Sequence, residues 1–280
     1  MLLTLPTWLL LLGLFAVPLG YGVYLSLRNE NLTSVIPAQY VGFENYRNEV
    51  GAQAFSDAAW VTAKMLVLGL LIQLPLGLGL ALLMAQRLRG TWLFRSALLI
   101  PMLLTPVAVG LMWRFMYDTD QGVIDWALSG IGLSRIDWLG DPTWSLIAVV
   151  LVDSWGSIPF VMLLALAGLL SLPESPFEAA RVDGAGALQR FWHITLPMLR
   201  PVLYVVVMIR MIDILKLFDV VFVVTARGGP GTSTQTLGLL NYNTFFFGEI
   251  SRAAAIGIAL TLVTLPVYAL WLRSVRAGNA

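Results

Sequence analysis

The sequence predicts an all-α polytopic membrane protein with six transmembrane helices. Of its 280 residues, 58% are hydrophobic and only 12% are charged, and the mean hydropathy is +0.81. A soluble domain carries about 25% charged residues, so this composition is typical of a chain surrounded by membrane lipid. Six stretches also reach the ~20 mostly apolar residues that cross a bilayer as a helix. We therefore expect a single transmembrane domain over residues 1–280.

The six predicted spans are joined by polar segments. They cover residues 2–27, 57–86, 96–117, 144–170, 202–224 and 253–272. Pro75 predicts a kink in the second span, and Asp153, Gly156 and Pro159 predict an interruption of the fourth. Between the third and fourth spans, residues 123–133 predict a short helix at the membrane interface.

Several function classes are excluded by what the sequence lacks. The net charge of +1 gives no electrostatic reason to bind nucleic acid. The chain has no cysteine and a single histidine, His193, so we expect no metal site. Neither lysine, Lys64 or Lys216, completes a phosphate-binding loop, and the hydrolase motifs G-x-S-x-G and H-E-x-x-H are absent. We expect no enzyme activity and no cofactor in this chain; if ATP and Mg²⁺ drive it, another subunit binds them.

The distribution of arginine predicts the orientation. Eight arginines lie in the turn after the second span, in the polar segment 175–201 and at the C-terminal end: Arg87, Arg89, Arg95, Arg181, Arg190, Arg200, Arg273 and Arg276. The loops on the other side are longer and more acidic. Because positive loops stay inside, we expect both termini and segment 175–201 in the cytoplasm.

Segment 175–201 is a polar island between apolar spans. Ser175 and Glu178 have the spacing of a capping box, and Gly184 with Gly186 predicts a turn after a short helix. A second short helix is expected to carry an apolar face that includes Phe191 and Trp192. Pro197 and Pro201 are expected to end this second helix. We interpret the segment as a docking loop for another protein; the alternative is that Glu178 only caps its own helix.

The residues of this loop resemble the EAA loop of ATP-binding-cassette (ABC) importer permeases. The likeness lies in Glu178-Ala179-Ala180, Asp183-Gly184-Ala185 and Ile194-x-Leu196-Pro197, with ten positions from Gly184 to Ile194. The resemblance implies a type I ABC importer permease architecture and a loop that sits in a cleft of a cytoplasmic ATPase. The implied docking residues are Glu178, Ala179, Ala180, Asp183, Gly184, Ala185, Phe191, Ile194, Leu196 and Pro197.

Ionisable residues inside the predicted spans indicate a polar pathway. An ionised group at the bilayer centre costs roughly 2.5 kcal/mol or more, so it usually faces a cavity or a partner. Arg210, Asp213, Lys216 and Asp219 alternate in sign at every third position of the fifth span. This spacing favours either a self-neutralising ladder at a subunit interface or a pathway wall that contains Arg210 and Asp213.

The fourth span contains a mixture of side chains that suits a sugar. Asp153, Ser154, Gly156, Ser157 and Phe160 offer a carboxylate, hydroxyls and a flat ring. The stretch resembles the segment that lines the sugar cavity of maltose-type permeases, although Asp153 and Phe160 stand where that pattern has an amide and a tyrosine. Maltose itself is therefore not implied. The alternative is that Asp153 pairs with Arg114 or another cation in the membrane and that Trp155 packs in the core.

Residues 40–46 and 225–255 also resemble the carbohydrate branch of this family. The resemblance implies a permease subunit in a prokaryotic inner or plasma membrane. Its expected partners are a second homologous permease, two copies of a cytoplasmic ABC ATPase, an extracellular or periplasmic solute-binding protein and a carbohydrate substrate. Two alternatives remain at this stage: an ion-coupled secondary transporter that uses Asp153 or Asp213 as a proton site, and a membrane anchor or receptor without a pathway.

Overall fold

The computed structural model describes residues 5–34, 37–86 and 90–278. The predicted basic residues Arg87 and Arg89 lie outside this range. Within it the chain is helical, and the only strand-like pairing is a single antiparallel bridge between Arg28 and Tyr40. The prediction of an all-α fold is therefore confirmed for the described residues.

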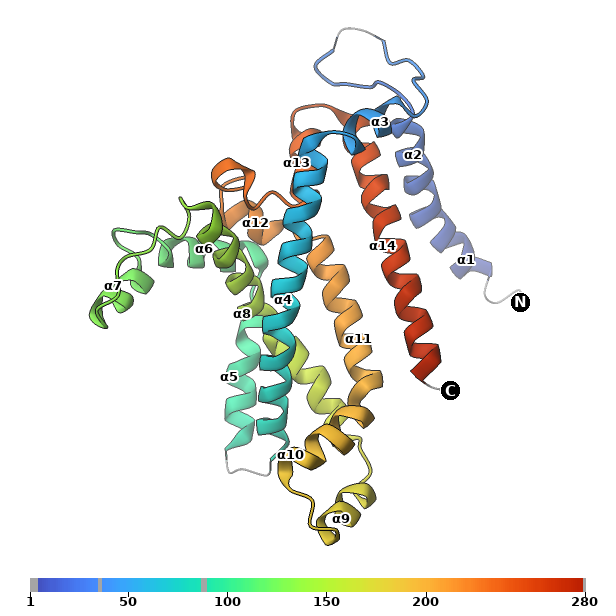
Figure 1. Cartoon of the computed structure of the whole chain (residues 1–280). Helices are drawn as coiled ribbons and strands as arrows, with labels where there is room; N and C mark the ends of the chain where they lie inside the picture. Colours follow the sequence, from blue (N-terminus) through green and yellow to red (C-terminus); the bar gives the residue numbers. More distant parts are fainter. Residues whose placement is uncertain (1–4, 35–36, 87–89, 279–280) are drawn as a thin grey trace.

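Most helices follow one another with short connections, and a longer loop joins α2 to α3 (Figure 1). The N-terminal half contains α1 (Leu5–Leu11), the π-turn η2 (Leu12–Ala16), α2 (Val17–Ser26), α3 (Glu44–Val50), α4 (Gln53–Ala85), α5 (Thr91–Leu103), α6 (Pro106–Met116) and α7 (Val123–Gly130). The C-terminal half contains α8 (Pro142–Leu170), α9 (Ser175–Val182), α10 (Ala187–Arg190), the π-turn η3 (Phe191–Thr195), α11 (Leu196–Leu215), α12 (Asp219–Val224), the 3₁₀ turn η4 (Pro230–Thr232), α13 (Leu237–Phe246) and α14 (Ile250–Gly278).

The core lies where α4 packs along α8 and α11. The buried face of α4 recurs at every fourth residue, with Gly69, Gln73, Gly77 and Ala81 on one line. A Cβ atom at Gly77 would lie 2.5 Å from Cγ1 of Val161, so the α4 backbone approaches α8 as closely as a glycine allows. Small residues that let helix backbones approach are typical of packing inside membranes. This close contact fixes α4 against α8 about one helical turn away from Gln73.

The first predicted span and the last one lie side by side at one edge of the molecule. Helices α1, η2 and α2 continue into one another, α2 packs on α14, and Figure 1 shows α2 and α14 to the side of α4 and α11. Their outer ends are joined by polar contacts. Glu30 N–H donates to Ser251 Oγ at 2.8 Å, and Arg252 forms ion pairs with Glu49 and, at 2.6 Å, with Glu249.

The third predicted span, residues 96–117, differs from a single transmembrane helix. Helices α5 and α6 are bent by 96° at a break of two residues, Leu104 and Thr105. Pro106 begins α6, and a proline disfavours helical backbone at the residue before it. Thr105 accordingly has an extended ψ of 138°. The prediction of a continuous span over residues 96–117 is therefore wrong, because Pro106 begins a helix that runs in a new direction.

The fourth and fifth spans also differ from the prediction. Helix α8 is unbroken from Pro142 to Leu170, because Asp153 and Gly156 keep helical hydrogen bonding and Pro159 is accommodated inside the helix. The fifth span is instead interrupted: α11 ends at Leu215, and α12 begins at Asp219 after a turn. The expected interfacial helix is present as α7.

Two of the described helices, α4 and α8, are long and apolar enough to cross a membrane, and α5 with α6 would add a third as a bent pair. Residues 12–26 and 250–266 are shorter apolar helices. Helix α11 carries Arg200, Arg210 and Asp213 over its 20 residues, so its composition is less apolar than that of α4. The helical membrane fold is thus clear, while the count of six spans stays a prediction.

Candidate functional site

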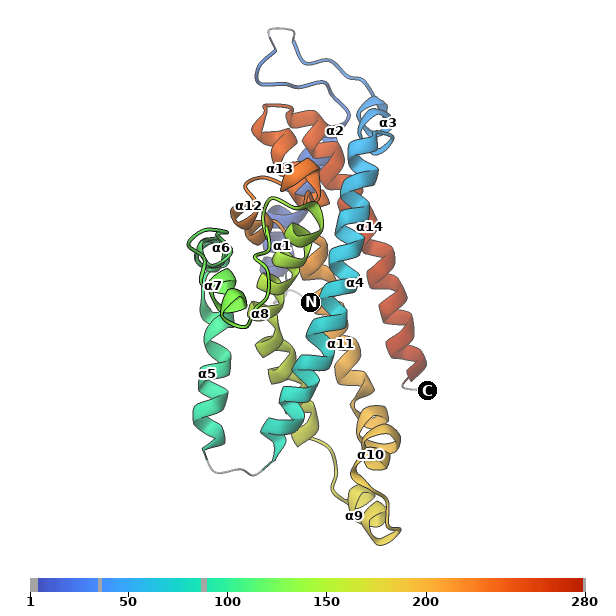
Figure 2. The same ribbon diagram turned by 60° about the vertical axis from the view of Figure 1, so that its left-hand side comes forward.

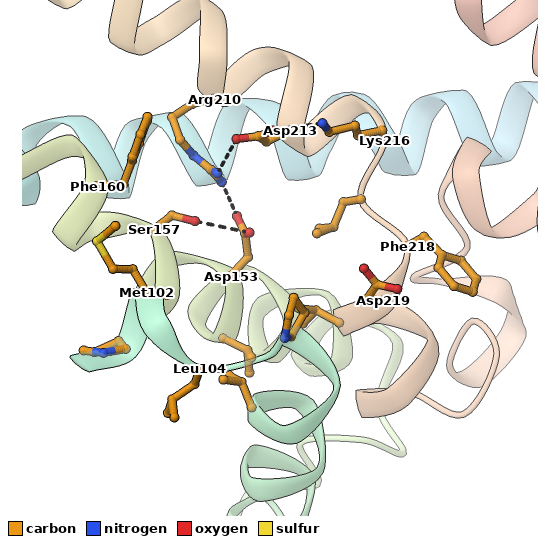
Figure 3. A pocket seen from close by; sticks show the side chains of 17 residues that line it. Met102, Leu104, Asp153, Ser157, Phe160, Arg210, Asp213, Lys216, Phe218 and Asp219 are labelled. Carbon is orange, nitrogen blue, oxygen red and sulfur yellow. Dashed lines mark hydrogen bonds and ion pairs between the residues drawn. The ribbon is translucent and has the colours of Figure 1, made fainter. Parts of the chain in front are cut away.

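A cavity of about 510 Å³ opens beside α8, at the level where α5 bends into α6 and α11 gives way to α12 (Figure 3). Its wall brings together residues that are distant in sequence. Six of the seven residues predicted to line a pathway lie on it: Asp153, Gly156, Ser157, Phe160, Arg210 and Asp213. The seventh, Ser154, is buried and is not among the lining residues.

Arg210 is the centre of the polar network at this wall. Its side chain is 6% exposed, and its Nε–H donates to Gln73 Oε1 at 2.9 Å. The two terminal nitrogens meet Asp153 Oδ2 at 2.8 Å and Asp213 Oδ2 at 3.3 Å. Because a charge buried without partners is very costly, this arrangement of three acceptors explains how α11 can hold an arginine here.

Asp153 is paired with Arg210 and not with Arg114. Asp153 Oδ2 also accepts a hydrogen bond from Gln73 Nε2 at 2.8 Å, and Ser157 Oγ lies 3.5 Å from Oδ1. Arg114 points elsewhere and donates to the carbonyl of Val223 at 3.3 Å. The alternative that Asp153 binds another cation in the membrane is therefore correct, with Arg210 as the partner.

Gln73 is a member of the network that the sequence analysis did not predict. It is fully buried on α4, where it donates to Asp153 and, at 3.2 Å, to Ser154 Oγ and accepts from Arg210. The available signal was a lone amide in the apolar second span. Gln73 connects α4, α8 and α11 through one side chain, which makes it the polar counterpart of the close contact at Gly77.

The charged ladder of the fifth span is only partly paired. Asp213 joins Arg210 to Lys216, whose Nζ lies 3.3 Å from Asp213 Oδ1. Asp219 forms no ion pair among the described residues. The three paired residues also line the cavity, whereas a subunit interface and a pathway at this wall both stay predictions. The cavity wall carries three carboxylates and two cations: Asp153, Asp213 and Asp219, and Arg210 and Lys216.

No group of three or more potential metal ligands occurs among the described residues. The cavity wall offers carboxylates, hydroxyls and apolar surface from Met102, Leu104 and Phe160. This combination suits the binding of a polyhydroxylated solute.

The predicted docking loop lies at the opposite end of the molecule from α3 and α13 (Figure 2). Helix α9 contains no buried residue, and Glu178, Ala179, Asp183 and Gly184 are all exposed. Gly184 has φ of +75°, the left-handed conformation that favours glycine, and Ala185 N–H donates to Ala180 O at 2.8 Å to close the helix end. The EAA residues thus form an exposed helix and turn.

The predicted capping box at Ser175 and Glu178 is wrong. Helix α9 begins at Ser175 without a side-chain cap, and the Glu178 N–H bonds the carbonyl of Glu174 at 3.0 Å. The box-like contact occurs one helix later, where Gln189 Oε1 accepts from Gly186 N–H at 2.8 Å. The alternative role for Glu178, capping its own helix, is therefore absent, and its carboxylate faces solvent.

The expected end of the second helix at Pro197 and Pro201 is also wrong. Residues 187–215 continue as one helix, because η3 widens the turn just before Pro197. In η3 the Leu196 N–H bonds Phe191 O, five residues back. A π-turn of this kind changes the hydrogen-bond register where proline lacks a donor. One continuous helix therefore carries both the docking region and Arg210 of the cavity.

Phe191 and Trp192, predicted as an exposed aromatic pair, face a groove beside α4, and their docking role stays a prediction. Both rings line an apolar groove of about 470 Å³ against α4, together with Leu78, Leu82 and Leu203. Trp192 is 57% exposed and Phe191 is half-buried. This aromatic pair thus belongs to the junction between the loop and α4, and the exposed EAA helix is the part of the loop that faces away from the spans.

Comparison with known proteins places the chain among transport proteins. Residues 73–277 match the family described as binding-protein-dependent transport system inner membrane component. The chain is 34% identical, over 97% of its length and 92% of the relative's, to the trehalose/maltose transport system permease protein MalF of Thermococcus litoralis. It is 36% identical, over 99% of its length and 90% of the relative's, to the sulfoquinovosyl glycerol transport system permease protein SmoG of Agrobacterium fabrum.

A solved structure shares the fold. A crystal structure of a bacterial ABC transporter involved in the import of the acidic polysaccharide alginate contains a chain that matches with a TM-score of 0.83. The sequence identity is 24%, and the match covers 98% of this chain and 94% of that one.

Proposed function

This chain belongs to the family of binding-protein-dependent transport system inner membrane components, and we propose that it passes a carbohydrate or related polyol across the membrane. It is a permease subunit of an ABC importer. Family membership disfavours an ion-coupled secondary transporter. A permease without ATP-binding motifs needs a separate ATPase, so ATP and Mg²⁺ are assigned to that partner and this chain does not hydrolyse ATP.

The carbohydrate class is supported by the cavity wall and by the names of the relatives. The relatives are permeases for trehalose or maltose and for sulfoquinovosyl glycerol. The wall of this chain presents carboxylates, a serine hydroxyl and the Phe160 ring to the same space. Asp153, Ser157, Phe160, Arg210 and Asp213 are the proposed pathway residues, with Ser154 and Gly156 supporting them on α8.

The continuous helix 187–215 is the observation that carries the coupling mechanism. An α-helix rises 1.5 Å per residue, so about 30 Å of helix, including the π-turn η3, links Arg190 to Arg210. A partner that moves the region around Glu178 and Gly184 would displace the start of this helix and, with it, the cavity wall. Closure of two ATPase copies would in this way open the cavity alternately to either side, with a second permease supplying the facing wall.

The proposed assembly also sets the orientation. The six predicted spans place the docking loop and both termini in the cytoplasm. The exposed outer segments near α3 and α13 are then available to an extracellular or periplasmic binding protein. Arg95, Arg181, Arg190 and Arg200 support this orientation through the positive-inside rule.

Reconstituted vesicles provide the test of this function. The chain is assembled with its second permease and ATPase, ATP is enclosed, and the binding protein is supplied outside with a labelled carbohydrate. We expect uptake with ATP alone and without an ion gradient. Uptake that persists after ATP removal would contradict the proposal.

A charge reversal tests the role of the loop in the same vesicles. Glu178→Lys is expected to leave the melting temperature of the subunit unchanged, because Glu178 makes no contact in its own chain that is needed for folding. Transport should fall while ATP hydrolysis becomes uncoupled or the ATPase dissociates. Glu174→Lys is the matched control, since Glu174 is also exposed and lies outside the EAA motif. Equal transport by the wild type and Glu178→Lys would contradict the docking role.

A further inference from the structure

We propose that Asp219 is a substrate-selecting residue of the cavity and that its carboxylate favours neutral polyhydroxylated solutes over anionic ones. The proposal rests on the proposed import of a carbohydrate and specifies its charge. The other charged side chains of the cavity wall form ion pairs with one another, whereas Asp219 forms none among the described residues.

Each of the two cations at the wall is paired with a carboxylate of the same wall. Arg210 is 6% exposed and faces two carboxylates, Asp153 at 2.8 Å and Asp213 at 3.3 Å. Lys216 is more exposed, but its ammonium group lies 3.3 Å from the other oxygen of Asp213. A sulfonate or carboxylate on a solute would have to compete with carboxylates that are already in place. The wall therefore lacks an unpaired cation that could recognise an acidic sugar.

Asp219 is the exception among the charged groups of the wall. Its carboxylate is exposed at the cavity and has no hydrogen bond or ion pair among the described residues. Figure 3 shows it on the opposite side of the Asp153–Arg210 pair from Phe160. Two sugar hydroxyls can donate to one carboxylate, and such charge-assisted hydrogen bonds are stronger than neutral ones. The same carboxylate repels an anionic solute, because like charges at close range are costly.

A purely structural role for Asp219 is a clear alternative. Asp219 is the first residue of α12, where a negative charge is favoured by the helix dipole. A residue with this role alone would change stability when substituted and would leave the preference between solutes unchanged. The measurement that separates the two roles is therefore the ratio of anionic to neutral solute taken up.

The experiment uses the complete transporter in vesicles with ATP inside and the cognate binding protein outside. The probes are a neutral disaccharide taken from a binding screen of that protein, with trehalose first, and the uronate of the same disaccharide. Asp219→Asn and Asp219→Lys are compared with the wild type. Because one binding protein delivers both probes to every variant, its own preference cancels when the uptake ratios are compared.

We expect Asp219→Asn to lower uptake of the neutral probe about tenfold at subsaturating concentration, as for loss of a hydrogen bond to a charged group. Asp219→Lys should raise the ratio of uronate to neutral uptake by about tenfold or more. The control is Asp120→Asn, which changes an exposed carboxylate outside the cavity and should leave both probes unaffected.

Unchanged uptake ratios in both Asp219 variants would overturn the proposal while carbohydrate import stands. A fall in melting temperature with unchanged ratios would assign Asp219 a structural role only and would also overturn it. If the wild type takes up no carbohydrate with ATP, the proposed function itself fails, and that outcome is distinct from the other two.

Discussion

The polar residues of α9 and those around Arg210 show opposite uses of charge in one chain. At α9 no side chain is buried, and Glu178 and Asp183 face solvent. At the cavity, Gln73 and Arg210 are buried and each bonds to partners on other helices. Polar groups inside a membrane must be satisfied within the protein, whereas those outside can be left for a partner. The difference indicates that the cavity network holds the helices together and the loop is built for contact with another subunit.

Removal of Arg210 should have the largest effect. Arg210→Ala leaves the buried Gln73 and the mostly buried Asp153 without their shared donor, and breaking a buried pair from one side costs about 3–5 kcal/mol. We expect a large loss of folded subunit in detergent, measured as melting temperature and recovered yield. The double variant Arg210→Met with Asp153→Leu should be more stable than Arg210→Ala, because it leaves no unpaired carboxylate at position 153. Normal stability of Arg210→Ala would contradict a structural role for this network.

A larger side chain at Gly77 should have the next largest effect. The Cβ atom that Gly77→Leu introduces would meet Val161 at 2.5 Å and Met162 N at 3.2 Å, so α4 and α8 must separate. Overpacking of this kind costs about 1–3 kcal/mol. Gly79→Leu is the matched control, because a Cβ at Gly79 meets nothing within 4 Å. Equal melting temperatures for the two variants would contradict the close contact between α4 and α8.

A β-branched residue at Gly184 should change coupling more than stability. Gly184 has φ of +75°, and a left-handed conformation costs an L-residue about 1–2 kcal/mol. Gly184→Val should therefore distort the turn after α9 and reduce transport per ATP hydrolysed, with the melting temperature of the spans retained. Gly186→Ala provides the comparison, because its φ of −67° is ordinary. Equal coupling in both variants would show that the turn geometry is not needed.

Lys216→Ala should have the smallest effect on stability. Lys216 forms an ion pair with Asp213, and its side chain is 67% exposed. Exposed ion pairs contribute about 0–1 kcal/mol to the free energy of unfolding. The melting temperature should change far less than in Arg210→Ala, although both residues contact Asp213. A fall in melting temperature as large as that of Arg210→Ala would show that pairing along the charged ladder, and not the burial of Arg210, determines the stability of the site.

The sequence predicted the residues of the loop and of the cavity better than their backbone. Asp153, Ser157, Phe160, Arg210 and Asp213 were expected at a pathway and lie together, because ionisable residues in an apolar stretch must find a shared polar space. Gln73 was missed because a single uncharged amide in a long apolar helix gives little periodic signal.

Proline was the main source of error in the backbone. Pro106 turns the chain by 96° between α5 and α6, whereas Pro159, Pro197 and Pro201 remain inside helices. Whether proline ends a helix depends on the neighbouring hydrogen-bond register, such as the π-turn before Pro197, and on packing by other helices. The sequence shows where the prolines are, but it does not show the hydrogen-bond register or the packing around each of them.

The coupling between the loop and the cavity is tested most directly by cross-linking at position 178. The chain has no cysteine, so Glu178→Cys introduces a single reactive thiol in this subunit. In the active, assembled transporter we expect this thiol to cross-link to the ATPase subunit, with a yield that changes when ATP is added. The account would be contradicted if the thiol stayed accessible to solvent-borne maleimide, or cross-linked only to its own spans, while ATP-driven uptake continued.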